Sequence, residues 1–283
     1  MEITTIIGLV LAVIVIAGSF MIQNISLAML FSAEALIVII LGTITAVMMA
    51  HPWSDVKVVP KLFKILFTKE KMPDKVDVLV QYKEYADEIR RSGVLALEDS
   101  VDEIEDPFMK RGMRLVVDGQ SSPEFLRDVL EEEVASMEER HAAYAKIFAS
   151  AGAYAPTLGV LGAAMGLIHA MGEMSNPDKL SEAIAAAFVC TIFGIFTGYV
   201  LWTPFANKLK VKSQKEVHLR YMMIEGVVAL QERNAPRVVE ERLLSFLSPK
   251  EKDVLRNGKG KKTREVEEIE RGQASQETAG GTR

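Results

Sequence analysis

The sequence predicts an all-α polytopic membrane protein with four transmembrane helices, whose long third and fourth helices extend into a helical cytoplasmic domain. Two observations lead to this prediction. The first is a set of four apolar stretches: Ile3–Ile22, Leu27–Ala50, Ile147–Met171 and Ala183–Asn207. Each stretch is long enough for a helix to cross a hydrocarbon core, which takes about 20 residues. The second is that Glu34 is the one Asp, Glu, Lys or Arg residue within these stretches, whereas the rest of the chain is strongly charged.

The apolar stretches divide the chain into five expected parts. These are residues 1–50 with transmembrane helices one and two, a cytoplasmic helical domain at 51–145, transmembrane helices three and four at 146–204, cytoplasmic helices at 205–247, and a disordered tail at 248–283. Ser122-Pro123-Glu124 has the residues of a helix start, so the third span is expected to belong to a helix of nearly 50 residues. The tail is polar and repetitive, which is typical of disorder.

The distribution of lysines predicts the topology. The link between the first two spans is uncharged, and Lys179 is the only basic residue in the link between the third and the fourth. Lysines cluster instead after the second span (Lys57, Lys61, Lys64, Lys69, Lys71) and after the fourth (Lys208, Lys210, Lys212, Lys215). Because basic residues favour the cytoplasmic side, we expect a multi-pass membrane protein with both termini in the cytoplasm.

Composition excludes several classes of function. Residues 51–145 contain 14 Lys/Arg and 21 Asp/Glu, and residues 205–283 contain 17 and 12. Neither block has the basic excess of a nucleic-acid-binding surface. Cys190 is the only cysteine, and no Cys/His cluster indicates a metal site. No nucleophile constellation or phosphate-binding loop is present either, so we expect neither an enzyme nor a bound cofactor.

Small residues in the last two spans predict close helix packing. Gly159, Gly162 and Gly166 lie in the third span, and Gly194 and Gly198 form a small-xxx-small pair in the fourth. Such residues let helix backbones approach each other in lipid. The two spans are therefore expected to pack against each other or against another chain.

Two prolines lie near the cytoplasmic ends of the same spans, Pro156 in the third and Pro204 in the fourth. Proline inside a helix removes a backbone hydrogen bond and tends to kink the helix. The two residues are therefore either hinges that pass a membrane event to the cytoplasmic helices or markers of the membrane boundary.

Few polar side chains lie within the spans. Thr191 either donates back to a carbonyl one turn earlier or lines an ion path, and Glu34 and His169 lie near the outer side, where interfacial positions are the simpler interpretation. No span has an ionisable residue near its middle, although a self-sufficient proton or sodium transporter usually needs one. If the protein conducts ions, a partner is expected to supply the titrating carboxylate.

Several separated motifs, in the same order, resemble the MotA/PomA flagellar stator family. They are Ala155–Met171, Thr191–Pro204, Arg90–Glu98, Ile104–Phe108, Leu115–Gly119, Met137–Arg140, and the pairs Ala33-Glu34 and Gly42-Thr43. The resemblance as a whole extends over residues 1–247 and leaves only the tail outside it.

The resemblance implies a function and a set of partners. It implies an ion-conducting, force-generating stator subunit of the bacterial inner membrane. Such a subunit self-associates into a ring, expected to be a pentamer, around a MotB-like single-span subunit with the ion-binding aspartate. By the same resemblance, Thr191 matches the threonine near that aspartate, and Pro156 and Pro204 couple ion flow to movement. Arg90 and Glu98 match the charged pair that engages the flagellar rotor switch protein. Membrane lipid is the remaining expected contact.

Ala163 bears on the transported ion. Sodium-driven relatives tend to have a hydroxyl residue at this place, so the resemblance and the alanine favour H+ over sodium. Two other functions stay open on the sequence. One is an ExbB/TolQ-type proton-driven energy-transducing subunit, which usually has three spans, and the other is a membrane scaffold that binds partners without conducting ions.

Overall fold

The protein is described here by a computed structural model that covers residues 3–22, 33–68, 72–119 and 122–256. These residues form helices joined by short turns and contain no β-strand, which confirms the all-α prediction. The chain forms two compact units. The first combines residues 1–71 with 136–215, and the second combines 72–135 with 216–283.

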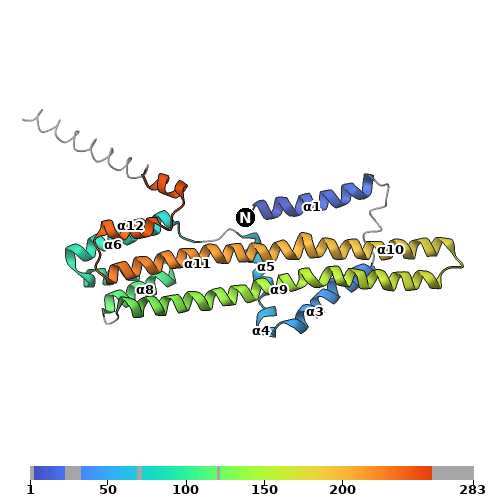
Figure 1. Ribbon diagram of the computed structural model, residues 1–283, viewed down its shortest axis with the longest axis horizontal. Coiled ribbons are helices and arrows are strands. Elements are labelled where there is room, and N and C mark those ends of the chain that lie inside the picture. The colour runs from blue at the N-terminus through green and yellow to red at the C-terminus, as the bar shows by residue number, and fades with distance from the viewer. Residues whose placement is uncertain (1–2, 23–32, 69–71, 120–121, 257–283) are drawn as a thin grey trace, which may run out of the picture. The chain divides into compact units, whose positions relative to one another are not determined.

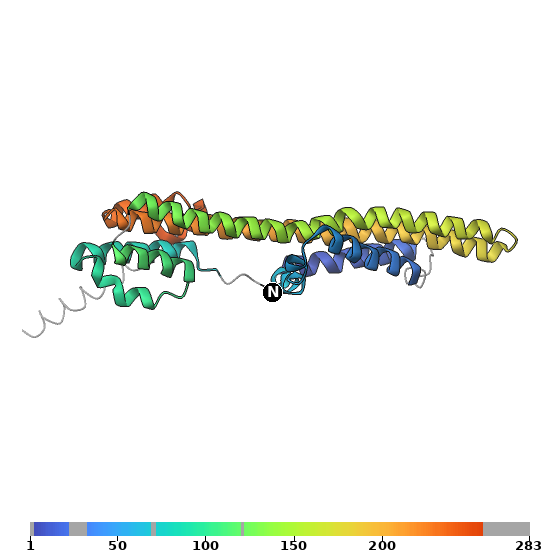
Figure 2. The same ribbon diagram turned by 90° about the horizontal axis from the view of Figure 1, so that it is seen from below.

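The first unit contains the apolar helices. Its elements are α1 (Ile3–Ile22), α2 (Ala33–Leu36), the π-helical segment η2 (Ile37–Leu41), α3 (Gly42–Ala50), α4 (Trp53–Val56), α5 (Val59–Phe67), most of α9 (Pro123–Gly172), α10 (Pro177–Phe196), the π-helical segment η4 (Thr197–Trp202) and the first part of α11 (Thr203–Gln231). Helix α10 lies along the C-terminal part of α9 in both views (Figure 1, Figure 2).

Three helical runs among the described residues are long and apolar enough to cross a membrane. They are α1, the 50-residue α9, and the run from Pro177 to Gln231. The second apolar stretch of the sequence appears as a shorter apolar helix, Ile37–Ala50, and the expected start of this span, residues 27–32, lies outside the described residues.

Helix α9 begins where the sequence predicted it. The backbone N–H of Phe125 donates to the Ser122 hydroxyl at 3.2 Å, so serine caps the helix and Pro123 occupies its first position. Pro156 lies inside α9 without interrupting it. In the next helix, η4 ends two residues before Pro204. A π-helical turn departs from the regular hydrogen-bond spacing of an α-helix. This irregular turn lies shortly before Pro204, which has no backbone N–H to donate to an earlier carbonyl.

An aromatic cluster holds α5 in the first unit. The rings of Phe63 and Phe148 meet edge to face with centroids 5.4 Å apart, and Phe63 also contacts Trp202 at 6.3 Å and Phe205 at 6.0 Å. Edge-to-face contacts at this separation are favourable for aromatic rings. The cluster therefore joins α5 to α9, η4 and α11.

The second unit is built from short charged helices. Its elements are α6 (Lys75–Ser92), the 3₁₀ segment η3 (Val94–Leu97), α7 (Glu98–Asp102), α8 (Pro107–Asp118), α12 (Pro236–Leu244) and the adjoining parts of α9 and α11. Gly93 ends α6 at φ 86° and Gly119 ends α8 at φ 65°. Both angles lie in a region that glycine adopts without the steric cost of a side chain.

The core of this unit includes a close contact between α6 and α11. A Cβ atom at Gly226 would lie 2.8 Å from ring carbons of Tyr82, which is fully buried. Burial is also the main reason that the pKa of Tyr82 is raised well above its ordinary value. The glycine therefore makes room for the aromatic ring.

Helical structure extends into the segment that was expected to be disordered. Residues 249–256 are helical, and the reason is a reciprocal cap. The Ser248 N–H donates to the Glu251 carboxylate at 2.6 Å, and the Glu251 N–H donates to the Ser248 hydroxyl at 3.4 Å. These bonds to Ser248 lower the pKa of Glu251. Residues 257–283 lie outside the described residues.

Candidate functional site

The first candidate region is the contact between α9 and α10. A Cβ atom added at Gly194 would lie 2.7 Å from the Ala155 carbonyl oxygen and 2.8 Å from the Gly159 Cα atom. A Cβ atom added at Gly159 would likewise lie 2.9 Å from the Cys190 carbonyl oxygen. These neighbours are backbone atoms, which cannot rotate away as a flexible side chain can. The two helices thus approach as closely as glycine permits.

The same contact continues toward the end of α9. A Cβ atom at Gly162 would lie 2.9 Å from the Cys190 sulfur, and one at Gly166 would lie 2.9 Å from the Ala187 Cβ atom. Cys190 is buried. Gly159, Gly162 and Gly166 of α9 therefore lie against one face of α10. We name these three glycines, together with Gly194 of α10, the glycine seam.

Pro156 extends the glycine seam to η4. A Cβ atom at Gly198 would lie 2.6 Å from Cγ and 2.7 Å from Cδ of Pro156. The proline ring thus occupies the space left by the missing side chain. Pro204, by contrast, is exposed on α11.

The candidate ion-pathway residues lie on the same two helices. The Thr191 hydroxyl donates to the Ala187 carbonyl one turn earlier, at 3.5 Å. This is the hydrogen bond back to the helix backbone that the sequence offered as one of two interpretations of Thr191. Thr191 is half-buried, and so is Ala163 on α9. Thr197, in η4, is buried and donates to the Phe193 carbonyl at 2.8 Å.

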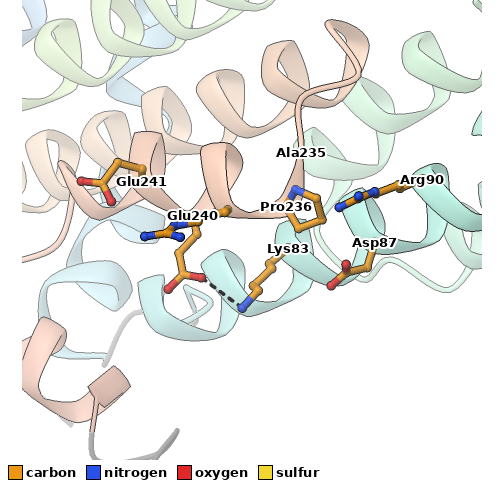
Figure 3. Close-up of a pocket in the computed structure, with 8 residues that line it drawn as sticks. Lys83, Asp87, Arg90, Ala235, Pro236, Glu240 and Glu241 are labelled. Carbon is orange, nitrogen blue, oxygen red and sulfur yellow. Dashed lines mark ion pairs between the residues drawn. The ribbon is translucent and has the colours of Figure 1, made fainter.

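The second candidate region is an open charged groove between α6 and α12, with a volume of about 680 Å³. Figure 3 shows Lys83, Asp87 and Arg90 along α6, and Glu240 on α12 with its carboxylate directed toward Lys83. Glu241 also lines the groove. Lys83 and Glu240 form an ion pair at 3.0 Å across the groove. We name this feature the α6–α12 groove.

Arg90 and Glu98 have different places in the second unit. Arg90 is exposed and lines the α6–α12 groove, and its guanidinium is directed toward Pro236 in Figure 3. Glu98 is also exposed but begins α7, outside the lining of the groove. The structure therefore does not place the two residues in one groove.

The helix that contains Glu98 has its own charged cluster. Asp102 accepts hydrogen bonds from Arg114 at 2.7 Å, and Lys110 lies 3.3 Å from the same oxygen. The hydrogen bonds from Arg114 and Lys110 lower the pKa of the Asp102 carboxyl. The surface around α7 and α8 thus carries two cations beside its acidic groups.

Sequence reasoning missed several members of these regions. Arg237, Glu240 and Glu241 belong to the α6–α12 groove, but α12 follows α6 only after more than a hundred residues, so no local pattern indicates the pairing. Cys190 was considered only as the single cysteine of the chain. Its position on the helix face of Gly194, one turn earlier, is a signal that could have assigned it to the glycine seam.

The comparisons with known proteins extend over both units. Residues 6–93 match the motility protein A N-terminal family, and residues 100–222 match the MotA/TolQ/ExbB proton channel family. Motility protein A of Bacillus subtilis (strain 168) is 49% identical over 252 residues, which cover 89% of this chain and 93% of the relative.

Solved structures agree with these matches. The flagellar MotAB stator complex from Bacillus subtilis contains a chain with a TM-score of 0.83 and 49% identity, which covers 87% of this chain and 96% of that chain. A chain of C. jejuni MotAB has a TM-score of 0.83 at 30% identity and covers 88% and 97%. Since the identity to the Bacillus relative extends over nearly its whole length, this chain belongs to the motility protein A family.

Proposed function

We propose that this chain is the ion-conducting, force-generating stator subunit of a bacterial flagellar motor. The observation that carries the proposal is the 49% identity to Motility protein A across 93% of that protein. Two solved structures with a TM-score of 0.83, both of MotAB assemblies, support it. The mechanism would be conformational work driven by ion flow, without covalent chemistry.

The proposed partner is a MotB-like single-span subunit. Apart from Glu34, the apolar stretches of the sequence contain no carboxylate, yet moving a proton through a membrane needs a group that can bind and release it. A partner helix that carries an aspartate supplies this group. Thr191 and Ala163 are the residues that we place beside it.

The proposed ion is H+. The family matched by residues 100–222 is described as a proton channel family, and Ala163 offers no side-chain oxygen. Sodium needs several oxygen ligands, whereas a proton can pass along hydrogen-bonded water, so an alanine at this place favours the proton.

We place the chain in the inner membrane with four spans and both termini in the cytoplasm. Lys57, Lys61 and Lys64 are exposed after α3, and Lys210 and Lys215 are exposed on α11, which agrees with the positive-inside rule. Several chains would form a ring, expected to be a pentamer, around the partner.

The glycine seam supports a role for Pro156 in coupling. At Gly159 and Gly194 the backbones of α9 and α10 meet directly, so a shift of one helix at this point displaces the other. Pro156 packs into the space at Gly198, beside the irregular turn η4 that precedes Pro204. A change at Thr191 would reach the two prolines through this contact.

The rotor-facing surface would be in the second unit. Arg90 is exposed on α6 and Glu98 is exposed on α7, with η3 between the two helices. The α6–α12 groove adds both signs of charge beside Arg90. A surface with alternating charges selects a partner with the complementary pattern and steers its approach. The proposed partner there is the flagellar rotor switch protein.

The test is motility of a stator-deleted strain that expresses this chain with its single-span partner. Swimming is measured with sodium, without sodium and with a protonophore. We expect rescue that persists without sodium, is lost with the protonophore, and is lost in Pro156→Leu. The matched control is Pro177→Leu, because Pro177 lies at the first position of α10 and no interior hydrogen bond depends on it.

Each alternative has its own outcome. Rescue that requires sodium would retain the stator and reject the assignment of H+. A stable membrane complex without any rescue would favour an ExbB/TolQ-type energy-transducing subunit or a non-conducting scaffold. The match of residues 6–93 to the motility protein A N-terminal family already favours the stator over the ExbB/TolQ type.

A further inference from the structure

The first unit contains a cavity that the proposed function does not use. It has a volume of about 370 Å³ and lies between α3, the α4–α5 segment, α9 and Trp202. This volume is in the range of pockets that bind small ligands, about 300–1,000 Å³. The size therefore suits an occupant larger than a few waters.

The wall of the cavity is apolar. Val47 and Met48 come from α3, Trp53 and Phe63 from the α4–α5 segment, and Ala151 from α9. No carboxylate or ammonium group lines it. Water has too few hydrogen-bonding partners in such a space, so a hydrocarbon is the matching occupant.

The entrance of the cavity is open to the surroundings of the helices. Met48 is 48% exposed and Trp53 is 67% exposed, although both also line the cavity. Tryptophan is enriched where a membrane meets water, because its ring is apolar and its N–H is polar. A chain from the neighbouring lipid leaflet can therefore enter without first crossing an aqueous surface.

The segment that forms one wall also carries positive charge. Lys57, Lys61 and Lys64 are exposed, and Asp55 is the only acidic residue from His51 to Thr68. Lysines near a membrane surface attract anionic headgroups. An anionic lipid would fill the apolar space with its acyl chain and give these cations a counter-charge with its phosphate group.

We propose that this cavity binds an acyl chain of an anionic phospholipid, whose phosphate group lies near Lys57, Lys61 and Lys64. The lipid would fill the space between α3 and α9 and would hold the α4–α5 segment at the membrane surface. The inference depends on the membrane location of the chain and not on its role in motility, so its test uses no swimming assay.

The test uses the full chain with its partner in bilayer discs of phosphatidylcholine. A small amount of phosphatidylglycerol with a photoreactive acyl chain is added, and labelled peptides are mapped by mass spectrometry. We expect labelling of the peptides that contain Met48, Trp53 and Ala151. Unlabelled phosphatidylglycerol should compete for these sites, and extra phosphatidylcholine should not.

Three variants separate a specific site from general lipid contact. Ala151→Phe fills the cavity and should reduce labelling there several-fold, whereas Thr43→Val keeps the shape of the wall and should retain it. The triple variant Lys57→Gln, Lys61→Gln, Lys64→Gln changes only exposed positions and should remove the preference for the anionic lipid, by about fivefold per lysine. Labels on α1 serve as the internal reference for non-selective contact.

Two results would overturn the proposal. The first is labelling of the cavity peptides that extra phosphatidylcholine reduces as strongly as unlabelled phosphatidylglycerol does, and that the lysine variant leaves unchanged. The second is a covalent cross-link to another copy of the chain from a photoreactive residue at Met48, which would assign the cavity to a subunit interface instead.

Discussion

The guanidinium of Arg220 binds the carboxylate of Asp106, with Nη1–O distances of 2.6 and 2.8 Å. Asp106 is also the N-cap of α8 and accepts the backbone N–H groups of Phe108 and Met109 at 3.0 Å each. The guanidinium lies over the Phe108 ring, 5.1 Å from its centroid. One carboxylate therefore ties α11 to the start of α8 within the second unit.

Asp106→Ala is expected to destabilise α8. The substitution removes the N-cap of α8. It also removes the Asp106 carboxylate from the guanidinium of Arg220, whose side chain is only 14% exposed. We expect a loss of about 2 kcal/mol, since hydrogen bonds to charged groups are the stronger ones. Hydrogen exchange of the α8 amides measures it, and Glu105→Ala, at the exposed neighbouring position, is the control. Equal exchange in both variants would contradict the role of the carboxylate.

Gly194→Ala is expected to push α9 and α10 apart. The new methyl group would meet backbone atoms of Ala155 and Gly159 at 2.7 and 2.8 Å, and overpacking of this kind costs about 1–3 kcal/mol. The thermal unfolding midpoint and motility should both fall. In Gly172→Ala the added Cβ atom has nothing within 4 Å, so this variant should behave as the unaltered protein does. A harmless Gly194→Ala would reject the glycine seam as a rigid contact.

Lys212→Met is expected to loosen the end of α5. The buried ammonium of Lys212 donates to the carbonyls of Ile65 and Thr68 at 2.8 and 2.9 Å, which the last turn of a helix otherwise leaves without partners. Removing the donor should cost about 1–3 kcal/mol. Faster hydrogen exchange across α5 is the readout. Lys210→Met changes an exposed lysine on the same helix and should have little effect.

The ion pair across the α6–α12 groove can be tested by exchanging its charges. Lys83→Glu places two carboxylates together, and Glu240→Lys places two ammonium groups together, so each should weaken the attachment of α12 to α6 and lower swarming speed. The double variant restores an ion pair and should recover part of both losses. A coupling energy of about 0.5–1 kcal/mol is expected for a partly exposed pair. Strictly additive losses would mean that the pair contributes nothing.

Asp102 predicts a dependence on pH. Hydrogen bonds from Arg114 and Lys110 lower the pKa of its carboxyl. A group with a lowered pKa stabilises the folded state above its ordinary pKa, and this contribution is lost as the pH falls through the lowered value. NMR titration of the side-chain carboxyl carbon should therefore show a midpoint below that of an unpaired aspartate. Arg114→Leu removes the hydrogen bond that contributes most to the lowered pKa of Asp102, so the midpoint should rise. A midpoint that does not change would contradict this role of Arg114.

The helical class and most of the element types could be predicted from local residue patterns. Apolar runs without charge require helices because a backbone in lipid must satisfy its own hydrogen bonds. Ser122 and Pro123 predicted the start of α9, and the cap is present at 3.2 Å. The family resemblance was also available from the sequence, because its motifs are short and contiguous. The tail prediction failed for residues 249–256, where a two-residue cap outweighs the polar composition.

The candidate sites could be predicted only in part. Gly159 and Gly194 were recognised from their spacing, but spacing could not decide whether the two helices meet each other or another chain. Lys212 was counted among the lysines of a cytoplasmic surface, and the structure places it in the interior as a helix cap. The residues of α12 beside Arg90 had no local signal at all.

The sequence by itself determined that the chain has apolar helices and which of its segments are expected on the cytoplasmic side. It also determined the family to which the chain is related. These properties depend on composition and on neighbours along the chain. Only the tertiary structure decided that Pro156 packs into the space at Gly198, that Arg90 lines a groove with Glu240, and that an apolar cavity opens beside Trp53. Each of these depends on residues far apart in the chain, and their contact is decided by close packing, which no local pattern contains.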